Sequence, residues 1–313
     1  MLVSFAQAYQ SNPVPTMMNY QPSDKAYAWP QDRHLALSIV INVEEGAEGN
    51  IADGDKYPEA VDEMGIALKR PIRNLGNESN YQYGLKRGAP RVMRLLERYQ
   101  IPATITGCAL ALERAPDLTA EIMRQGHEVT SHGYRWAHQF MMTEDQERDY
   151  IARATESIER STGKRPMGWL SRYLTTENTR RLLIEAGYRY HMDDLSDDEP
   201  FWDQINGKPI IVLPYQVDNN DMKMWSDRAH SPDDWLKYAI DNFEWLLREG
   251  EHEVNVMSIG LHLRIIGRPG RIWALERFLE HVATARERAN GPWIATRLDI
   301  AEHFAAQVPF TSA

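Results

Sequence analysis

Short apolar runs alternate along the chain with longer stretches in which apolar residues recur every three or four positions. The run at 35–43 is apolar and rich in β-branched residues, which is typical of a strand buried on both faces of a parallel sheet. In the stretch 89–99, Val92, Leu95 and Leu96 have helical spacing and predict an amphipathic helix. Related patterns predict strands at 101–106, 127–132, 168–170, 210–213, 254–262 and 293–294, and helices at 120–125, 143–162, 177–186, 232–249, 271–288 and near the end of the chain.

At least six strand–helix alternations follow one another without a break in composition. This order favours a single α/β domain over residues 35–313, built as a distorted and incomplete (β/α) barrel. Residues 46–86 are rich in Gly, Asn and Tyr and are predicted as long loops. Residues 1–34 contain four prolines and no apolar period, so we expect an N-terminal arm that packs on the barrel or on a neighbouring subunit.

Composition narrows the classes of function. The 313 residues include 35 Lys and Arg against 45 Asp and Glu, a formal net charge of −10. A surface this acidic repels phosphate backbones and anionic lipids, so we expect neither a nucleic-acid nor a membrane partner. The single cysteine, Cys108, excludes an internal disulfide framework and a multi-thiolate metal site. The first 16 residues lack the pattern of a signal peptide, so a cytoplasmic location is expected.

Residues with functional chemistry lie where four of the predicted strands end. In (β/α) barrels the chemistry lies at this edge, because the carboxyl ends of the parallel strands and the loops that follow them meet there. The sequence therefore predicts that two acids, two imidazoles and a guanidinium converge on one rim. They are Glu44 and Glu45 after the first strand, His132, Arg172 and His262.

These positions resemble the motifs of the polysaccharide deacetylase superfamily of carbohydrate esterases. Asn-Val-Glu-Glu-Gly at 42–46 is similar to the first motif, Thr-Phe-Asp-Asp-Gly, with Glu in place of Asp. His-Gly-Tyr-Arg-Trp at 132–136 is similar to the second motif, His-Ser/Thr-x-x-His, except that Trp136 replaces the second histidine. The segment 165–172 resembles the third motif, and Leu-His at 261–262 resembles the last. The resemblance covers most of the chain and implies a distorted, incomplete barrel of the (β/α)7 type.

One branch of this superfamily, which contains allantoinases and cyclic-imide hydrolases, is the most similar. The segments 131–136 and 258–271 resemble its second and final motifs, the tryptophan included, and 178–183 and 219–222 are also similar. The resemblance implies a hydrolase of non-peptide C–N bonds in a small cyclic amide or ureide, with allantoin as the leading substrate. The alternatives are a cyclic-imide hydrolase and a metal-dependent N-deacetylase of an acetylated sugar.

The departure from the second motif bears on the cofactor. Sugar deacetylases of the superfamily bind zinc through Asp-His-His, and a catalytic zinc generally needs three protein ligands. Glu45 and His132 are the residues that would hold a metal if one is bound, because Trp136 cannot coordinate an ion. We therefore expect no cofactor, with zinc or another divalent metal as the alternative.

Without a metal, the reaction depends on acid–base chemistry by the predicted catalytic residues Glu44, Glu45, His132 and His262. Glu44, in the base position of the family, would take a proton from the attacking water. Glu45 beside it adds a second negative charge, which would raise the pKa of one of the two carboxyls. His262 or His132 would protonate the leaving nitrogen or stabilise the oxyanion.

Arg172 and Trp136 are the predicted substrate-binding residues. The planar fork of Arg172 would hold a carboxamide or ureide oxygen, and Trp136 would pack on a planar five-membered ring. Three arginines within 264–271 form a basic cluster that we expect at a subunit interface, and we expect a homo-oligomer, either a dimer or a tetramer. The acidic pair at 193–194 is interpreted as part of a solvated loop.

Overall fold

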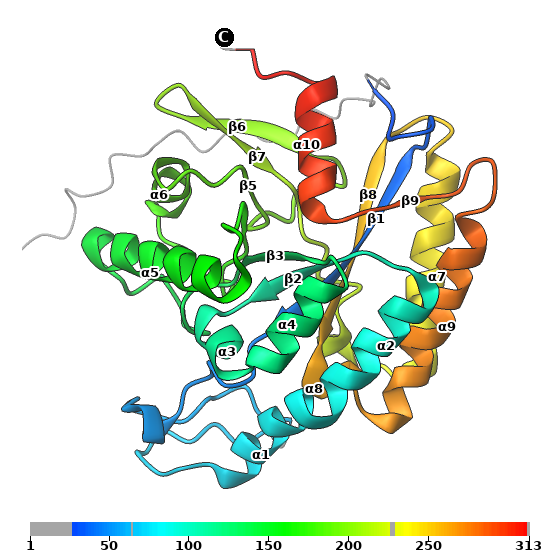
Figure 1. Cartoon of the computed structure of the whole chain (residues 1–313). Coiled ribbons are helices and arrows are strands. Elements are labelled where there is room, and N and C mark those ends of the chain that lie inside the picture. The colour runs from blue at the N-terminus through cyan, green and yellow to red at the C-terminus, as the bar shows by residue number, and fades with distance from the viewer. Residues whose placement is uncertain (1–26, 64, 226–228, 312–313) are drawn as a thin grey trace, which may run out of the picture.

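The sheet at the centre of the molecule is curled but not closed (Figure 1). The computed structural model describes residues 27–63, 65–225 and 229–311. Its strands are β1 (Leu35–Val43), β2 (Ala103–Gly107), β3 (Glu128–Ser131), β4 (Gly168–Trp169), β5 (Tyr190–His191), β6 (Phe201–Ile205), β7 (Lys208–Val212), β8 (Asn255–His262) and β9 (Trp293–Ile294). They form one sheet in the order β6-β7-β5-β4-β3-β2-β1-β8, with β9 also on β1. The path starts at β6 and ends at β8, which confirms the predicted α/β fold with an incomplete, distorted barrel.

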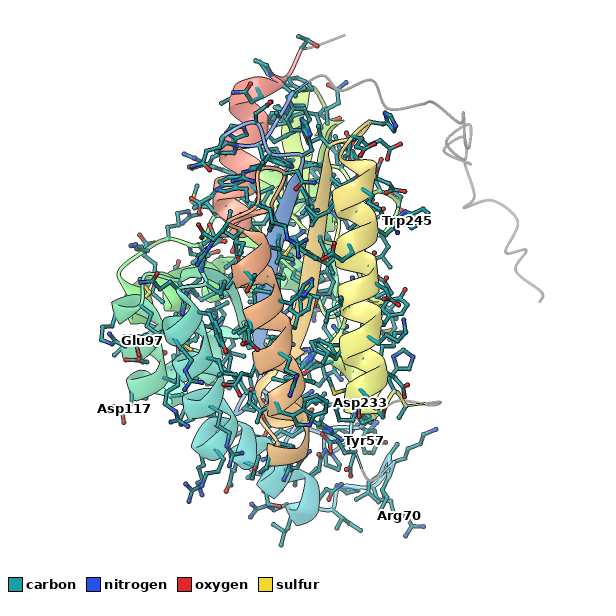
Figure 2. The ribbon with its side chains drawn as sticks, turned by 90° about the vertical axis from the view of Figure 1, so that its right-hand side faces the viewer. Tyr57, Arg70, Glu97, Asp117, Asp233 and Trp245 are labelled. Carbon is teal, nitrogen blue, oxygen red and sulfur yellow. The ribbon has the colours of Figure 1, made fainter. Side chains whose placement is uncertain are left out.

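Helices cover the outer side of this sheet. They are α1 (Leu75–Tyr83), a π-helical turn (Gly84–Gly88), α2 (Ala89–Tyr99), α3 (Ala109–Arg114), α4 (Pro116–Arg124), α5 (Glu144–Thr162), α6 (Thr179–Glu185), α7 (Pro232–Glu249), α8 (Leu263–Ile266), α9 (Pro269–Ala285) and α10 (Arg297–Gln307). Figure 2 shows α7 and α9 side by side. The ring of Trp235 in α7 packs on that of Phe278 in α9, with 6.2 Å between the ring centroids. Trp245 lies on the exposed side of α7, where it is 56% exposed.

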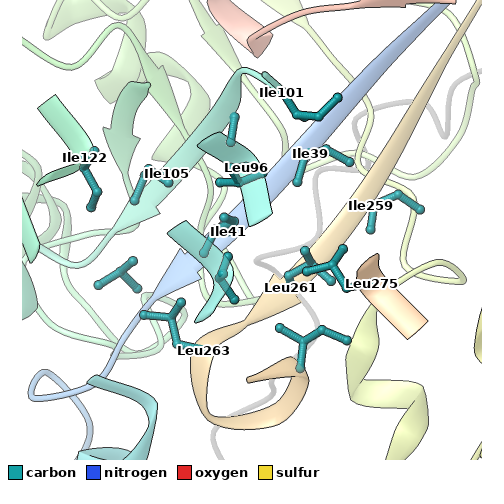
Figure 3. Close-up of a cluster of buried hydrophobic side chains, with 14 of the residues drawn as sticks. Ile39, Ile41, Leu96, Ile101, Ile105, Ile122, Ile259, Leu261, Leu263 and Leu275 are labelled. Carbon is teal, nitrogen blue, oxygen red and sulfur yellow. The ribbon is translucent and has the colours of Figure 1, made fainter. Parts of the chain in front are cut away.

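Strand β1 is buried on both faces, and this explains its continuous apolar sequence. Ile39 and Ile41 belong to the larger apolar cluster, together with Leu96 from α2 (Figure 3). Val40, which points to the other face, belongs to a second cluster with Leu213. Since both faces are covered and both edges are paired, β1 is a fixed base for the two glutamates that follow it.

The side chain of Gln216 crosses the gap that strand pairing leaves between the loop after β7 and strand β8. Gln216 donates from Nε2 to the carbonyl oxygen of Val256 at 3.1 Å and accepts at Oε1 from the N–H of Ser258 at 2.9 Å. Arg297, at the start of α10, is buried and donates to two carbonyl oxygens of the same loop. The bonds of Gln216 hold the loop against β8, whose last residue is His262, and those of Arg297 tie the same loop to α10.

The segment 46–86 differs from its prediction as a loop, because it includes α1 and the π-helical turn. The sequence of α1 is polar and carries little apolar periodicity, so it gives no amphipathic signal. Its polar contacts stabilise it: Asn74 caps the helix by accepting from the N–H of Asn77, whose side chain donates to the carbonyl oxygens of Glu59 and Val61. Strands β5 and β6 were also outside the predicted elements.

The described part of the predicted N-terminal arm packs on the barrel. Trp29 is 1% exposed, and its Nε1 donates to the carbonyl oxygen of Asn255 at 3.0 Å. Residues 1–26 of the predicted arm lie outside the described residues. Within the described part of the chain, no helix combines the length and the apolar character that crossing a bilayer requires.

A methyl group added at Gly88 is expected to destabilise the fold. A Cβ there would overlap the backbone carbonyl of Leu263, so the π-helical turn would have to move away from α8. Because that neighbour is backbone, we expect Gly88→Ala to lower the free energy of unfolding by about 2–4 kcal/mol, measured by chemical denaturation.

Gly270→Ala is the matched control for this substitution. Gly270 lies in the first turn of α9, and a Cβ there would meet nothing within 4 Å. We expect this variant to be more stable than the wild type by about 0.5–1 kcal/mol, because alanine loses less backbone entropy in a helix. Equal stability of the two variants would contradict the proposed close approach at Gly88.

Candidate active site

Most of the predicted site residues gather at the carboxyl ends of the strands. A cavity of about 800 Å³ opens there, and its wall includes apolar side chains such as Leu170, Met192 and Val217. Five of the six predicted site residues line it. They are Glu44, His132, Trp136, Arg172 and His262.

Glu44 lies at the centre of the site, directly after β1. Its Oε1 is 3.4 Å from Nε2 of His132 and 3.4 Å from Nε2 of His262. Its Oε2 accepts a hydrogen bond of 2.8 Å from Arg264. Burial raises the pKa of Glu44, but the positive charges of Arg264 and His262 outweigh it and hold this pKa well below its ordinary value. Glu44 is therefore ionised at neutral pH.

His262 ends β8 and lies between two carboxylates. Its Nδ1 bonds to Oδ1 of Asp221 at 2.7 Å, and its backbone N–H donates to Oδ2 of the same residue at 2.9 Å. Burial lowers the pKa of His262, but the charges of Glu44 and Asp221 outweigh it and raise this pKa to about 9. His262 is therefore an imidazolium at neutral pH and can donate a proton from Nε2.

Glu45 is the predicted site residue that the structure turns away from the cavity. Its Oε1 accepts from the backbone N–H of Arg264 at 3.1 Å, and its Oε2 accepts from the backbone N–H of Glu44 at 3.2 Å. The close backbone of Gly84 leaves no room for a Cβ beside this carboxyl. Burial, together with the charge of Glu44, raises the pKa of Glu45 despite the nearby guanidinium. Glu45 thus ties the end of β1 to the start of α8.

The two ring nitrogens of His132 are both committed to protein partners. Nδ1 is 2.6 Å from the carbonyl oxygen of Leu170, which can only accept, and Nε2 accepts from Nε1–H of Trp136 at 3.1 Å. With these partners Nδ1 carries a proton, and the lone pair of Nε2 faces the indole N–H. Nε2 also lies 3.4 Å from Oε1 of Glu44, and this neighbour contributes to the lowered pKa of Glu44.

Arg172 holds Trp136 in place. Its terminal nitrogens donate to both carboxylate oxygens of Glu59, at 2.6 and 3.0 Å, and to the carbonyl oxygen of Trp136 at 2.6 Å. Its guanidinium lies 3.6 Å from the centre of the indole ring. The terminal nitrogens predicted to hold a substrate oxygen are thus engaged within the protein, and one face of the predicted ring-stacking surface is occupied. Arg172 positions the indole N–H that reaches His132.

Sequence reasoning missed Arg264 and Asp221. Arg264 was expected in an interface cluster, but it is 2% exposed and bonded to Glu44. Its position two residues after His262 was the available signal. Asp221 lies in the segment 219–222 that resembles the allantoinase branch, but no pattern linked it to a histidine. The predicted solvated pair at 193–194 also lines the cavity, because it follows β5.

The residues present do not fit a divalent metal in the manner of the sugar deacetylases, although members of the family are generally metal-dependent. In the described residues no group of three His, Cys, Asp or Glu side chains is arranged to hold an ion. The donor chemistry gives the reason: the lone pair of His132 Nε2 accepts from Trp136, and both oxygens of Glu45 accept from backbone N–H groups. The two residues predicted as metal ligands are thus used within the protein.

Comparison with known proteins identifies the relatives of the chain. It is 31% identical over 309 residues to a Schizosaccharomyces pombe protein named "Putative polysaccharide deacetylase", covering 90% of this chain and 93% of the relative. It is 27% identical over 255 residues to the Helicobacter pylori peptidoglycan deacetylase, covering 71% of this chain and 85% of the relative. The chain is also similar to the crystal structure of Puue allantoinase, with 40% sequence identity and a TM-score of 0.87. The match covers 93% of this chain and 96% of that chain.

The fold, the acid–base groups at the strand ends and these relatives together define a hydrolase that acts on C–N bonds. The polysaccharide deacetylase family pattern matches residues 79–191. With the similarity to the fission-yeast protein over nearly the whole of both chains, the chain belongs to the polysaccharide deacetylase family.

Asp221→Asn is expected to lower the pKa of His262. The wild-type pKa of about 9 depends on two carboxylates, and the substitution neutralises one of them. Since the ordinary value is 6.5, the stabilisation from protonated His262 is complete below about pH 6.5 and is lost as pH rises through 9. We expect the variant to show a lower His262 pKa by NMR titration and a smaller loss of stability between these pH values.

Asp218→Asn is the matched control, because Asp218 lies in the same loop but bonds to Tyr238. We expect its His262 titration to equal that of the wild type. An unchanged titration in Asp221→Asn would show that Glu44 alone keeps the ring charged.

Proposed function

We propose that the protein hydrolyses a C–N bond in a small cyclic amide, with allantoin as the first candidate substrate. The observation that carries this proposal is the pairing of a proton acceptor, Glu44, with a proton donor, His262, 3.4 Å apart in one cavity. The use of His132 Nε2 by Trp136, in place of a metal, supports the same proposal. The 40% identity to Puue allantoinase supports allantoin.

Glu44 and His262 can carry the proton transfers of ring opening. Glu44 takes a proton from a water molecule whose oxygen attacks the carbonyl carbon of the ring. The C–N bond then breaks, and His262 gives its Nε2 proton to the leaving nitrogen. The proton on Glu44 returns to Nε2 of His262 across the 3.4 Å between them, which restores both groups. The water thus supplies the hydroxyl of the new acid and, through the pair, the hydrogen on nitrogen.

Arg264 and Asp221 set the direction of these transfers. Arg264 binds Oε2 of Glu44 and leaves Oε1 facing both imidazoles. Asp221 binds Nδ1 of His262 and leaves Nε2 as the proton donor. The two buried cations thus balance two buried carboxylates. This arrangement leaves Glu44 as the proton acceptor and His262 as the proton donor.

The size of the cavity is also compatible with a second candidate function, the deacetylation of a sugar. About 800 Å³ is within the usual range of small-molecule sites, and it would also admit an acetylated sugar residue. The names of the fission-yeast and Helicobacter relatives point to such substrates for those proteins. An N-deacetylase is therefore the alternative, and a cyclic-imide hydrolase is the nearer variant of the first proposal.

A substrate panel tests the proposal. Purified protein is assayed with allantoin, hydantoin, succinimide, dihydrouracil and N,N′-diacetylchitobiose, with and without a chelator. We expect ring opening of allantoin that survives chelation, and a loss of about 10²-fold or more in Glu44→Gln, because the base is removed. Acetate release from chitobiose that chelation abolishes would replace the proposal with the deacetylase alternative.

The pH dependence of kcat/KM tests the assigned roles of the pair. Since His262 acts in its protonated form, we expect activity to fall as pH rises through about 9. The pKa of Glu44 is held well below the ordinary value of a glutamate, so kcat/KM should fall on the acid side only at low pH. We therefore expect kcat/KM to be constant around neutral pH. Activity that instead rises with pH near 6.5 would identify a neutral imidazole as the base.

A further inference from the structure

Tyr173, which follows β4 at the edge of the cavity, has a backbone conformation that is unusual for an aromatic residue. Its φ is +58°, in the left-handed region, where bulky residues are genuine outliers. The four other positive values in non-glycine residues of the described chain each have a local explanation in a turn or a helix end. Gln100 caps the end of α2, Asn206 precedes Gly207 in the β6–β7 hairpin, and residues 31–32 form the turn between Trp29 and Arg33. Tyr173 lines the cavity instead.

Fixed neighbours hold Tyr173 in this conformation. Ser171 is bonded through its N–H and its hydroxyl to Asp193, and Arg172 is bonded to Glu59. The N–H of Leu174 donates to the carbonyl oxygen of Arg172 at 2.8 Å, the hydrogen-bond pattern of a γ-turn centred on Tyr173. With a positive φ at its centre, this turn is the rare and strained form. Backbone strain of this kind persists where the surroundings enforce it, and it occurs preferentially at functional sites.

The turn places Tyr173 in the wall of the cavity. Tyr173 is 61% exposed, and within the described residues its hydroxyl has no hydrogen-bond partner. Partial desolvation and the charge of Glu44 raise its pKa, so the hydroxyl keeps its proton and can donate it. Two neighbouring side chains cannot fill the same role, because Ser171 donates to Asp193 and the terminal nitrogens of Arg172 donate to protein oxygens.

Ring opening requires a donor that the acid–base pair does not supply. As water adds to the carbonyl carbon, negative charge develops on the carbonyl oxygen, and a positioned donor there stabilises the transition state. His262 is needed at the leaving nitrogen, and Arg264 is engaged with Glu44. The site therefore lacks an assigned partner for that oxygen.

We propose that Tyr173 is the substrate-contacting residue that fills this role, its hydroxyl donating a hydrogen bond to the carbonyl oxygen of the amide that is cleaved. This inference rests on the proposed amide hydrolysis and adds the residue that binds the oxygen. The strained turn then serves to hold the phenol at the wall of the cavity. Tyr173 thus combines a cost in stability with a gain in rate.

Two substitutions separate the hydroxyl from the strain. Tyr173→Phe removes the hydroxyl and keeps the ring and the backbone, so we expect an unchanged Tm and a loss of about 10²-fold in kcat with little change in KM. Tyr173→Gly removes the side chain and relaxes the positive φ, so we expect at least the same loss of kcat with a Tm equal to or above that of the wild type. Both are measured with allantoin and by thermal unfolding.

Gln100→Gly is the matched control, because Gln100 has a φ of +52° but lies exposed at the end of α2. We expect its Tm to rise and its kcat to equal the wild-type value. A wild-type kcat in Tyr173→Phe would overturn the role of the hydroxyl, and a Tm well below wild type in Tyr173→Gly would overturn the strain. If the wild-type enzyme cleaves an acetylated sugar instead of a cyclic amide, the proposed function fails, and the same variants measured on that sugar decide the role of Tyr173 separately.

Discussion

The buried charge of Glu44 is the constraint on which the rest of the site depends. A carboxylate that is 1% exposed is costly unless charged partners surround it, and removal of one partner leaves a charge that water cannot reach. Arg264 and His262 supply those partners, and Asp221 in turn balances His262. The four groups form a chain of alternating charge that no one strand or helix could provide. The ends of β1 and β8 must therefore stay in register, which their parallel pairing ensures.

A second set of contacts determines the chemistry of His132. The ion pair between Glu59 and Arg172 supports the indole of Trp136, and the indole N–H occupies the nitrogen that would otherwise face the cavity. A residue from the loop after β1 thus controls an imidazole that follows β3. Trp136 therefore does more than shape the cavity wall, because its indole N–H also occupies a ring nitrogen of His132.

The barrel and much of its rim followed from local patterns. The continuous apolar sequence of β1 and the helical spacing of α2 predicted both elements, because each is determined by its own burial. The hairpin of β6 and β7 was missed despite its Asn206–Gly207 turn, a recognised hairpin signal. The roles of Asp221 and Arg264 were missed for another reason: they depend on contacts across 41 and 220 positions of sequence, and no local period records such a contact.

The side-chain amide of Gln216 substitutes for a strand where the sheet would otherwise close. A closed barrel can change its diameter only by changing strand number or stagger, which alters every register at once. Here the side chain of Gln216 joins the two margins of the sheet, together with the hydrogen bond from its own backbone N–H to the hydroxyl of Ser258. This margin is therefore held largely by side chains, which can be replaced without changing the hydrogen-bond register of any strand. A scaffold of this kind can accept changes at its open side without a change in strand number or stagger.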